Sequence, residues 1–318
     1  MNYSVTTIAQ GEDVAQLAIP KRDLSRDEWL NARRTGIGSS DAAAVVGQNP
    51  YKTPYQLWLE KRGEIAEPDL SDNEAVQLGN SLEAWVGAEF ARRTGRKVRR
   101  DNFVRRHPEH PHMLANLDFR IVAEDGGEPE ILECKIAGAH AVFGEQWGDG
   151  PDEVPRHYLI QVMHQMIVDG RKRAFIAALL ASTKFRVYEI AYDAEIAEML
   201  IAAEARFWRS VQTGELPEIM TIDDALRAYP ISNGAEIQAS SRIALACHDY
   251  RVAKHEQKQL DARIKDLQGK IGAFMGDAEI LMRGQQKLLT WKTQTRAAYA
   301  VKESSTRVFR LAKEEEAV

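Results

Sequence analysis

The 318-residue sequence contains two cysteines, Cys134 and Cys247, and no long hydrophobic run. Two cysteines so far apart exclude a disulfide framework and a four-cysteine zinc or iron–sulfur site. The longest apolar run, residues 174–181, is far below the roughly 20 residues that a membrane-spanning helix needs. The first residues lack the basic segment and apolar stretch of a secretory signal. We therefore expect a cytoplasmic protein with no membrane partner.

The sequence also has little excess charge, with 42 Lys and Arg against 47 Asp and Glu. Residues 218–318 are slightly basic and residues 1–217 are acidic, so the larger segment is not the basic domain typical of nucleic-acid-binding proteins. The 44% hydrophobic content is that of an ordinary globular protein. Any function in phosphate binding must therefore depend on a local patch or on bound metal ions.

Hydrophobic periodicity and turn residues predict an α/β (α+β) protein with a mixed central sheet flanked by helices. Residues 1–24 have weak periodicity, and we expect an irregular or loosely docked N-terminal arm. The helices are expected over residues 25–34, 42–46, 54–62, 73–94, 155–169 and 193–212. The strands are expected over residues 96–100, 102–106, 113–122, 130–136, 175–180 and 185–191.

The C-terminal third has a different organisation. Residues 214–234 contain Pro217 and Pro230 and predict a linker. Apolar residues at 3–4 spacing over residues 235–275 predict a long coiled-coil-like or hairpin helix, serving as an intersubunit or intramolecular arm. A β-hairpin is expected near residues 280–291. The expected organisation is thus 1–24, 25–213, 214–234 and 235–318, the last being a C-terminal helical arm and hairpin.

Three charged residues stand on two neighbouring predicted strands. Residues i and i+2 of a strand face the same side, so Glu133 and Lys135 project together and Cys134 points away. If the two strands pair as a hairpin, Asp118 lies beside Glu133. Carboxylate oxygens are preferred ligands of Mg²⁺, and a bound metal can neutralise a phosphate and lower the pKa of water. Lys135 could orient that water or accept its proton.

The Glu-x-Lys element by itself is weak evidence. It occurs again at Glu256 and Lys258 on the predicted long helix, and exposed charge pairs of no functional consequence are common. The flanking motifs are therefore decisive. They are RRTGIGSSD (33–41), GQNPY (47–51), LW (57–58), GNSLE (79–83), NLD (116–118), ECK (133–135) and YLIQ (158–161).

In this order, the motifs resemble the YqaJ-type viral recombinase family, relatives of phage lambda exonuclease within the PD-(D/E)XK nuclease superfamily. The resemblance covers roughly residues 25–212 and implies a nuclease domain over 25–213 with a restriction-endonuclease-like core. The usual Pro-Asp pair is Leu117-Asp118 here, which keeps the acidic ligand.

The resemblance also implies roles for individual residues. Asp118, Glu133 and the backbone carbonyl of Cys134 would bind Mg²⁺, for which Mn²⁺ could substitute, and Lys135 would position or activate the attacking water. Glu83 would hold metal-bound water or a second metal. Further residues would contact DNA: Gln161 at the scissile region, and Arg33 or Arg34, Ser40 and Tyr158 at the phosphate of the DNA end.

Two further features are open to more than one interpretation. The arginines and lysine between residues 92 and 106 either follow a DNA backbone or belong to a solvated hairpin. His164 is interpreted as a polar residue on a helix face.

The resulting hypothesis is a Mg²⁺-dependent DNA exonuclease of phage or prophage origin, acting in the bacterial cytoplasm. By resemblance it would resect linear double-stranded DNA ends in the 5′ to 3′ direction, for a single-strand annealing protein. Relatives form homo-oligomeric rings, often trimers. Two alternatives remain: an endonuclease or other repair nuclease with the same site, and a non-catalytic scaffold that binds DNA ends.

Overall fold

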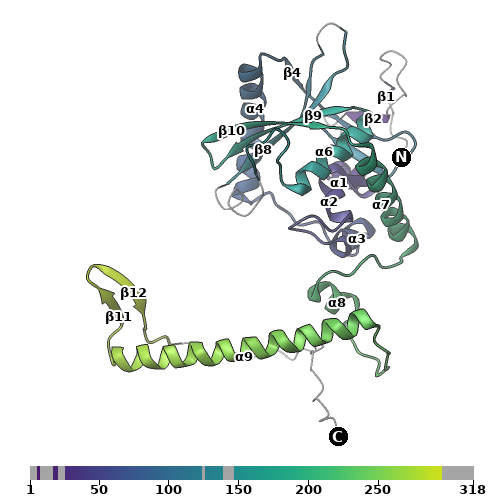
Figure 1. The fold of residues 1–318 in the computed structure, drawn as a ribbon. Helices are drawn as coiled ribbons and strands as arrows, with labels where there is room; N and C mark the ends of the chain where they lie inside the picture. Colours follow the sequence, from purple (N-terminus) through teal and green to yellow (C-terminus); the bar gives the residue numbers. More distant parts are fainter. Residues whose placement is uncertain (1–5, 8–16, 21–25, 124–125, 139–146, 296–318) are drawn as a thin grey trace. The chain divides into compact units, whose positions relative to one another are not determined.

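The computed structural model describes residues 6–7, 17–20, 26–123, 126–138 and 147–295 (Figure 1). The chain divides into two compact units, Met1–Ala225 and Leu226–Val318. This division falls inside the segment 214–234, which also contains the short helix α8 (Ile222–Ala228). Thr221 begins this helix because its Oγ1 accepts a hydrogen bond from the Asp224 amide at 3.1 Å.

The helices of the first unit lie close to their predicted positions. Helix α2 begins earlier than expected because the Asp41 carboxylate accepts a hydrogen bond from the Gly38 amide at 3.4 Å, which closes the first turn. No helix among the described residues is both long and apolar enough to span a bilayer. The helices are α1 (Arg26–Arg34), α2 (Ser39–Val45), α3 (Pro54–Arg62), α4 (Glu74–Thr94), α6 (Arg156–Asp169) and α7 (Ala194–Thr213).

Two five-stranded sheets form the framework of this unit. The parallel pairs are β8 with β9 and β3 with β6, and the other described pairs are antiparallel, so the predicted mixed α/β architecture is confirmed. The first sheet runs β1 (Thr6–Thr7), β2 (Leu17–Pro20), β5 (Phe103–Arg106), β6 (Met113–Asn116) and β3 (Ile37–Gly38). The second runs β10 (Lys184–Ala191), β9 (Arg173–Leu180), β8 (Glu130–Ala137), β7 (Phe119–Ile121) and β4 (Val98–Arg100).

Two predictions about strands are wrong. The strand expected over 113–122 is two strands, β6 and β7, which belong to different sheets. Between them, the Asp118 carbonyl accepts a hydrogen bond from the Asp101 amide at 3.0 Å as the chain crosses from one sheet to the other. Within the arm expected to be irregular, β2 pairs with β5. A four-residue strand is too short for its alternation to stand out.

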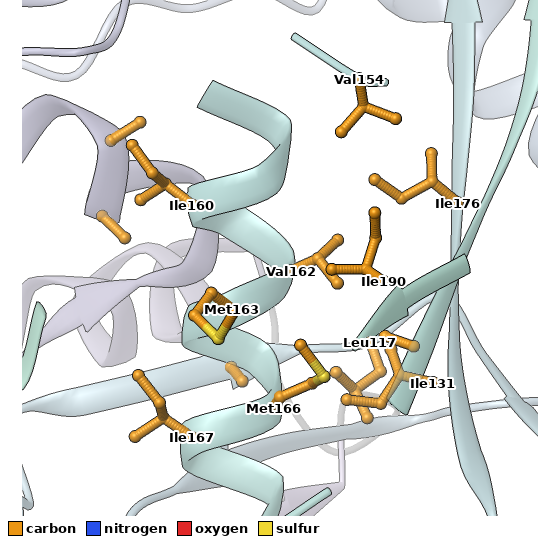
Figure 2. Packing of buried hydrophobic residues seen from close by; sticks show 14 of the residues in the cluster. Leu117, Ile131, Val154, Ile160, Val162, Met163, Met166, Ile167, Ile176 and Ile190 are labelled. Carbon is orange, nitrogen blue, oxygen red and sulfur yellow. The ribbon is translucent and has the colours of Figure 1, made fainter. Parts of the chain in front are cut away.

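Alternate residues of the second sheet pack on two different layers. On one face, Ile131 and Ile176 belong to the apolar cluster that surrounds Met163 and Met166 of α6 (Figure 2). On the other face, Leu132 and Cys134 belong to a separate cluster with residues of α4. This period of two directs the side chains of residues 131, 133 and 135 of β8 toward the α6 layer.

The second unit contains a long helix and a hairpin, as predicted. Helix α9 (Ser241–Met275) begins at Ser240, whose Oγ accepts a hydrogen bond from the Ile243 amide at 3.4 Å. The hairpin pairs β11 (Ile280–Arg283) with β12 (Gln286–Thr290), and Gly284 adopts a positive φ of 59° in its turn.

Candidate active site

The predicted hairpin brings the two acidic residues together. Strands β7 and β8 pair antiparallel with Phe119 opposite Leu132, so the neighbouring position Asp118 lies beside Glu133. The Asp118 Oδ2 accepts a hydrogen bond from the Cys134 amide at 2.8 Å. The Lys135 Nζ donates to the Glu133 Oε1 at 2.6 Å. Two carboxylates and one amine therefore meet at the point where the chain enters the second sheet.

Helix α6 supplies two amides that hold the Glu133 carboxylate. Gln161 Nε2 donates to Oε1 at 2.6 Å, and Gln165 Nε2 donates to Oε2 at 2.7 Å. The two glutamines are one turn apart and share a helix face. Gln161 was predicted from its motif, whereas Gln165 was missed, although its i+4 spacing from Gln161 could have revealed it. With these donors and Lys135, the buried carboxylate of Glu133 is fully hydrogen-bonded.

A cavity of about 160 Å³ opens beside these groups. It joins the predicted metal ligands to part of the predicted phosphate site, although the two come from distant parts of the sequence. Two polar atoms on its lining residues, Ser39 Oγ and Asn116 Oδ1, are buried without a hydrogen-bond partner among the described residues. Orphaned buried polar atoms are rare in folded proteins, which favours a ligand here. The predicted residues that line the cavity are Arg33, Ser40, Asp118, Glu133 and Gln161.

The other predicted residues do not line this cavity; these are Arg34, Glu83, Cys134, Lys135 and Tyr158. Glu83 of α4 accepts a hydrogen bond from Arg100 at 2.6 Å. Arg34 is exposed at the end of α1. The Tyr158 ring lies 4.9 Å from the Lys135 Nζ, a cation–π contact. Tyr158 thus contacts the candidate catalytic lysine.

Burial and neighbouring charges shift the pKa values of the residues in this cluster. Burial raises the pKa of Asp118 well above its usual value, and the charges of Glu133 and Glu83 raise it further. Burial would lower the pKa of Lys135, but the Glu133 and Asp118 carboxylates outweigh it, and this pKa lies above its ordinary value. Burial also raises the pKa of the Cys134 thiol, so Cys134 is a packed residue and not a nucleophile.

The donor set fits a hard divalent cation. Burial raises the pKa of Asp118, and the nearby charges of Glu133 and Glu83 add to this effect, which a bound cation would offset. Among the described residues, no group of three or more His, Cys, Asp or Glu side chains is arranged to hold a metal ion. Zinc sites usually have three or four such ligands, whereas Mg²⁺ binds through one or two carboxylates and keeps several waters. Two neighbouring carboxylates, Asp118 and Glu133, are donors of the kind that Mg²⁺ accepts.

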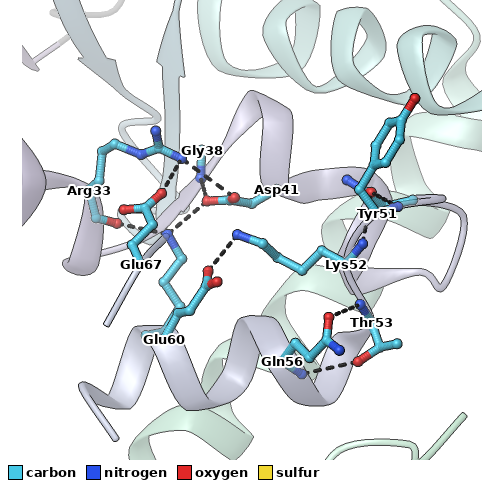
Figure 3. Close-up of polar contacts among 11 residues, drawn as sticks. Arg33, Gly38, Asp41, Tyr51, Lys52, Thr53, Gln56, Glu60 and Glu67 are labelled. Carbon is cyan, nitrogen blue, oxygen red and sulfur yellow. Dashed lines mark hydrogen bonds and ion pairs between the residues drawn. The ribbon is translucent and has the colours of Figure 1, made fainter. Parts of the chain in front are cut away.

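A buried ion-pair network holds Arg33 at the cavity (Figure 3). The Arg33 guanidinium lies 3.6 Å from Asp41 Oδ1 and 3.2 Å from Glu67 Oε1. Lys61 Nζ donates to Asp41 Oδ2 at 2.7 Å and to the Arg33 carbonyl at 2.9 Å. Burial would raise the pKa of Asp41, but Lys61, Arg33 and Lys52 hold it well below its usual value. The sequence assigned no role to Asp41 or Lys61.

The basic cluster between residues 92 and 106 is extensively ion-paired. Arg100 binds Glu83, and Arg105 binds the buried Asp101. These pairs favour a structural function over a free track for DNA. The other pairs are Arg92 and Arg93 with Glu89, and Arg96 with Glu130.

His164 is more than the polar residue on a helix face that we expected. It is fully buried, with Nδ1 2.8 Å from the Glu204 Oε1 and Nε2 2.9 Å from the Leu114 carbonyl oxygen. Burial would lower the pKa of His164, but Glu204 and the Leu114 carbonyl raise it. His164 joins α6 to α7 and to β6, and it was misassigned because its partner lies 40 residues away in the sequence.

Comparison with known proteins assigns the family. The profile of the YqaJ-like viral recombinase domain matches residues 28–172. The uncharacterized protein YqaJ of Bacillus subtilis (strain 168) is 36% identical over 273 residues, which cover 83% of this chain and 83% of that protein. The chain belongs to the YqaJ family. Every predicted site residue of this YqaJ-family protein lies within the matched domain.

Similarity to solved structures is weaker. An alkaline exonuclease, LHK-Exo from Laribacter hongkongensis, aligns with a TM-score of 0.46 at 17% identity, covering 59% of this chain and 93% of that one. A phage-related exonuclease from Haemophilus somnus 129PT aligns with a TM-score of 0.41 at 12% identity, covering 58% and 99%. Likeness at this level does not determine an activity.

Proposed function

We propose that this YqaJ-family protein is a metal-dependent DNA exonuclease that resects linear double-stranded ends. One observation carries the proposal: Asp118 and Glu133 line the same cavity as Arg33 and Ser40, and Lys135 donates a hydrogen bond to Glu133. Acidic ligands, a positively charged amine and an arginine at one cavity suit the binding and hydrolysis of a phosphodiester.

The proposed cofactor is Mg²⁺, with Mn²⁺ as a substitute. Asp118, Glu133 and the Cys134 carbonyl would hold it, and Glu83, whose charge already acts on Asp118, would hold metal-bound water or a second metal. When bound, the metal would neutralise charge on the phosphate and make water a better nucleophile.

The protein's own side chains would do the remaining work. Lys135 donates a hydrogen bond to Glu133, so its amine would lie close enough to orient water and stabilise negative charge on the phosphate. Gln161 and Gln165 keep the Glu133 carboxylate in place. Arg33, with Ser40, would bind the phosphate of the DNA end, exchanging its contact with Glu67 for the phosphate.

The wider function follows from the recombinase family. We propose 5′ to 3′ resection that leaves a 3′ overhang for a single-strand annealing protein, in the bacterial cytoplasm and from a phage or prophage gene. A homo-oligomeric ring, with a trimer as the leading possibility, would hold DNA topologically. The net charge of −5 makes such enclosure more useful than long-range attraction to DNA.

The decisive experiment compares DNA ends. Linear duplexes with 5′-phosphate, 5′-hydroxyl or hairpin-closed ends are digested beside covalently closed circles, with Mg²⁺, Mn²⁺ or chelator. We expect metal-dependent loss of a 5′-end label from open linear DNA, fastest with the 5′-phosphate, and none from closed substrates. The Asp118→Asn variant is the matched inactive control, because it keeps the side-chain shape and loses the charge.

The other results select the alternatives. Cutting of closed circles would favour an endonuclease with the same site. Binding of open ends without cleavage in either metal would favour the scaffold. Release of the 3′-end label first would reverse the proposed polarity while leaving the nuclease assignment intact.

A further inference from the structure

Helix α9 carries a row of exposed apolar side chains that is interrupted by the polar Gln257. Leu260, Ile264 and Leu267 expose 44–57% of their surface, and Phe274 exposes 81%. Trp291, which follows the hairpin, packs against Gly272, where an added Cβ would lie 3.2 Å from the indole ring. Phe274 remains exposed to solvent. These four side chains are therefore largely exposed to solvent. An exposed apolar stripe of this kind usually marks an interaction surface.

The stripe follows a strict heptad repeat through five heptads. Positions a and d alternate at spacings of three and four, and this pattern forms a narrow coiled-coil seam rather than the broad apolar face of a surface helix. Its central a position is the polar Gln257, and a single polar seam residue commonly specifies register. The a residues are Ile243, Tyr250, Gln257, Ile264 and Ile271. The d residues are Ala246, Ala253, Leu260, Leu267 and Phe274.

The side-chain sizes along the seam select an antiparallel partner. In a parallel, in-register pair each residue would face itself, so two alanine layers would leave voids and Gln257 would face Gln257. In an antiparallel pair centred between Gln257 and Leu260, small residues face large ones, which fills the interface evenly. The layers are then Ala246 with Ile271, Ala253 with Ile264, Tyr250 with Leu267, Ile243 with Phe274 and Gln257 with Leu260.

The flanking charges select the same arrangement. Heptad positions e and g flank the seam on its two sides. In the antiparallel register, each residue at g faces a g residue of the other helix, and each residue at e faces an e residue. A parallel pair would place a residue at g against the residue at e five positions later, which gives one repulsive pair, Glu256 with Asp261, and one attractive pair, Asp249 with Lys254. Lys270 has a same-helix partner, Asp266, at 2.6 Å, but this pair is exposed and weak enough to exchange. The antiparallel register opposes Asp249 to Lys270, Glu256 to Arg263 and Lys254 to Asp261.

We propose that α9 is a self-association surface that binds a second copy of α9 in antiparallel register. The seam from residue 243 to residue 274 is roughly 48 Å long. The contact is isologous, since the same residues serve both chains, and every pair occurs twice. It joins chains two at a time. If the nuclease units also form a three-membered ring, this contact links two rings into an assembly of six chains.

Charge reversal in the full-length protein tests the pairing. Glu256→Lys places a lysine against Arg263 at both symmetry-related contacts, and Arg263→Glu places a glutamate against Glu256 at both. Each variant should therefore raise the dissociation constant measured by sedimentation equilibrium at least roughly tenfold. The double variant Glu256→Lys with Arg263→Glu restores both attractions and should recover the wild-type mass. Lys265→Glu, at an exposed b position outside the seam, is the matched control and should leave the mass unchanged. Circular dichroism checks that α9 stays helical in each variant.

Thiol cross-linking tests the direction of pairing. In a Cys247→Ser background, Ala246→Cys combined with Ile271→Cys should form an intermolecular disulfide on oxidation, whereas Ala246→Cys by itself should not. Cross-linking of the single variant would overturn the antiparallel register. A wild-type mass of one chain or of an odd number of chains, or no effect of either single charge reversal, would overturn the proposal. Cleavage of linear DNA is a separate readout, so failure of this contact and failure of the nuclease assignment are distinguishable.

Discussion

At the scale of single residues, the candidate site depends on how the protein treats buried charge. Glu133 is 3% exposed, yet it accepts hydrogen bonds from Lys135, Gln161 and Gln165. Asp118 has one amide donor, from Cys134, and its pKa is raised by burial and by Glu133. The more weakly satisfied carboxylate is thus the one that a cation would stabilise most.

Replacing Lys135 by alanine should abolish most cleavage. Loss of its charge removes stabilisation of the reacting phosphate and of the attacking water, so kcat should fall about 10²- to 10⁴-fold. DNA binding should change little, because the Arg33 side of the cavity is intact. Single-turnover cleavage and binding assays measure the two effects, with Lys184→Ala on the exposed start of β10 as control. Unchanged turnover would remove Lys135 from the mechanism.

Arg33 and Arg34 form a natural pair of test and control. Arg33 lines the cavity and is ion-paired with Asp41 and Glu67, whereas Arg34 is exposed. Arg33→Ala should raise KM for 5′-phosphorylated ends roughly 10- to 100-fold, because one charge-assisted contact is lost. It should also remove the preference for 5′-phosphate over 5′-hydroxyl ends, an effect that mere destabilisation would not produce. A larger effect of Arg34→Ala would exchange the two assignments.

At the scale of elements, helix α6 connects the site to the core. One face presents Gln161 and Gln165 to Glu133, and the apolar cluster surrounds Met163 and Met166 (Figure 2). The buried pair His164 and Glu204 joins α6 to α7. Because both His164 nitrogens face oxygen acceptors, the imidazolium is the form that satisfies both contacts.

This ion pair predicts a pH dependence of stability. The pKa of His164 is raised in the folded protein, because Glu204 and the Leu114 carbonyl outweigh burial. Its contribution is therefore complete below about pH 6.5, the unfolded value, and is lost as pH rises through the folded pKa. Glu204→Gln should reduce the free energy of unfolding by roughly 2 kcal/mol at pH 6 and flatten its decline at higher pH.

Denaturant unfolding between pH 6 and pH 9 measures this effect. Glu198→Gln, an exposed residue of the same helix, should leave both the stability and its pH dependence unchanged. Parallel curves for the wild type and Glu204→Gln would show that His164 is neutral throughout this range.

At the scale of the whole molecule, chemistry and association belong to different units. All the predicted site residues lie within Met1–Ala225, and the proposed pairing helix lies within Leu226–Val318. Compact units with separate cores commonly fold independently.

Truncation after residue 234 tests this separation. The shortened protein should cleave a short linear duplex at a rate per chain within about threefold of the full chain. It should also lose the pairing through α9, so the number of chains per assembly should fall by half. Cleavage assays and sedimentation measure the two outcomes on one preparation. A truncated protein that keeps the same number of chains per assembly but loses turnover would contradict both expectations.

The sequence by itself determined the parts of the site that depend on local periodicity. The alternation along residues 130–136 placed Glu133 and Lys135 on one face and Cys134 on the other, and hairpin pairing placed Asp118 beside Glu133. These relationships involve neighbours on a strand or across one hairpin, and the geometry of a strand is the same wherever it occurs.

Only the tertiary structure decided the contacts between residues far apart in the sequence. It broke the strand at Leu117 and Asp118, buried His164 against Glu204, and placed Arg33 rather than Arg34 at the cavity. Each outcome depends on which helices and strands pack together. The buried pairs also depend on which charged groups become neighbours in the folded protein. Short-range patterns do not contain that information, because the partner becomes a neighbour only when the chain has folded.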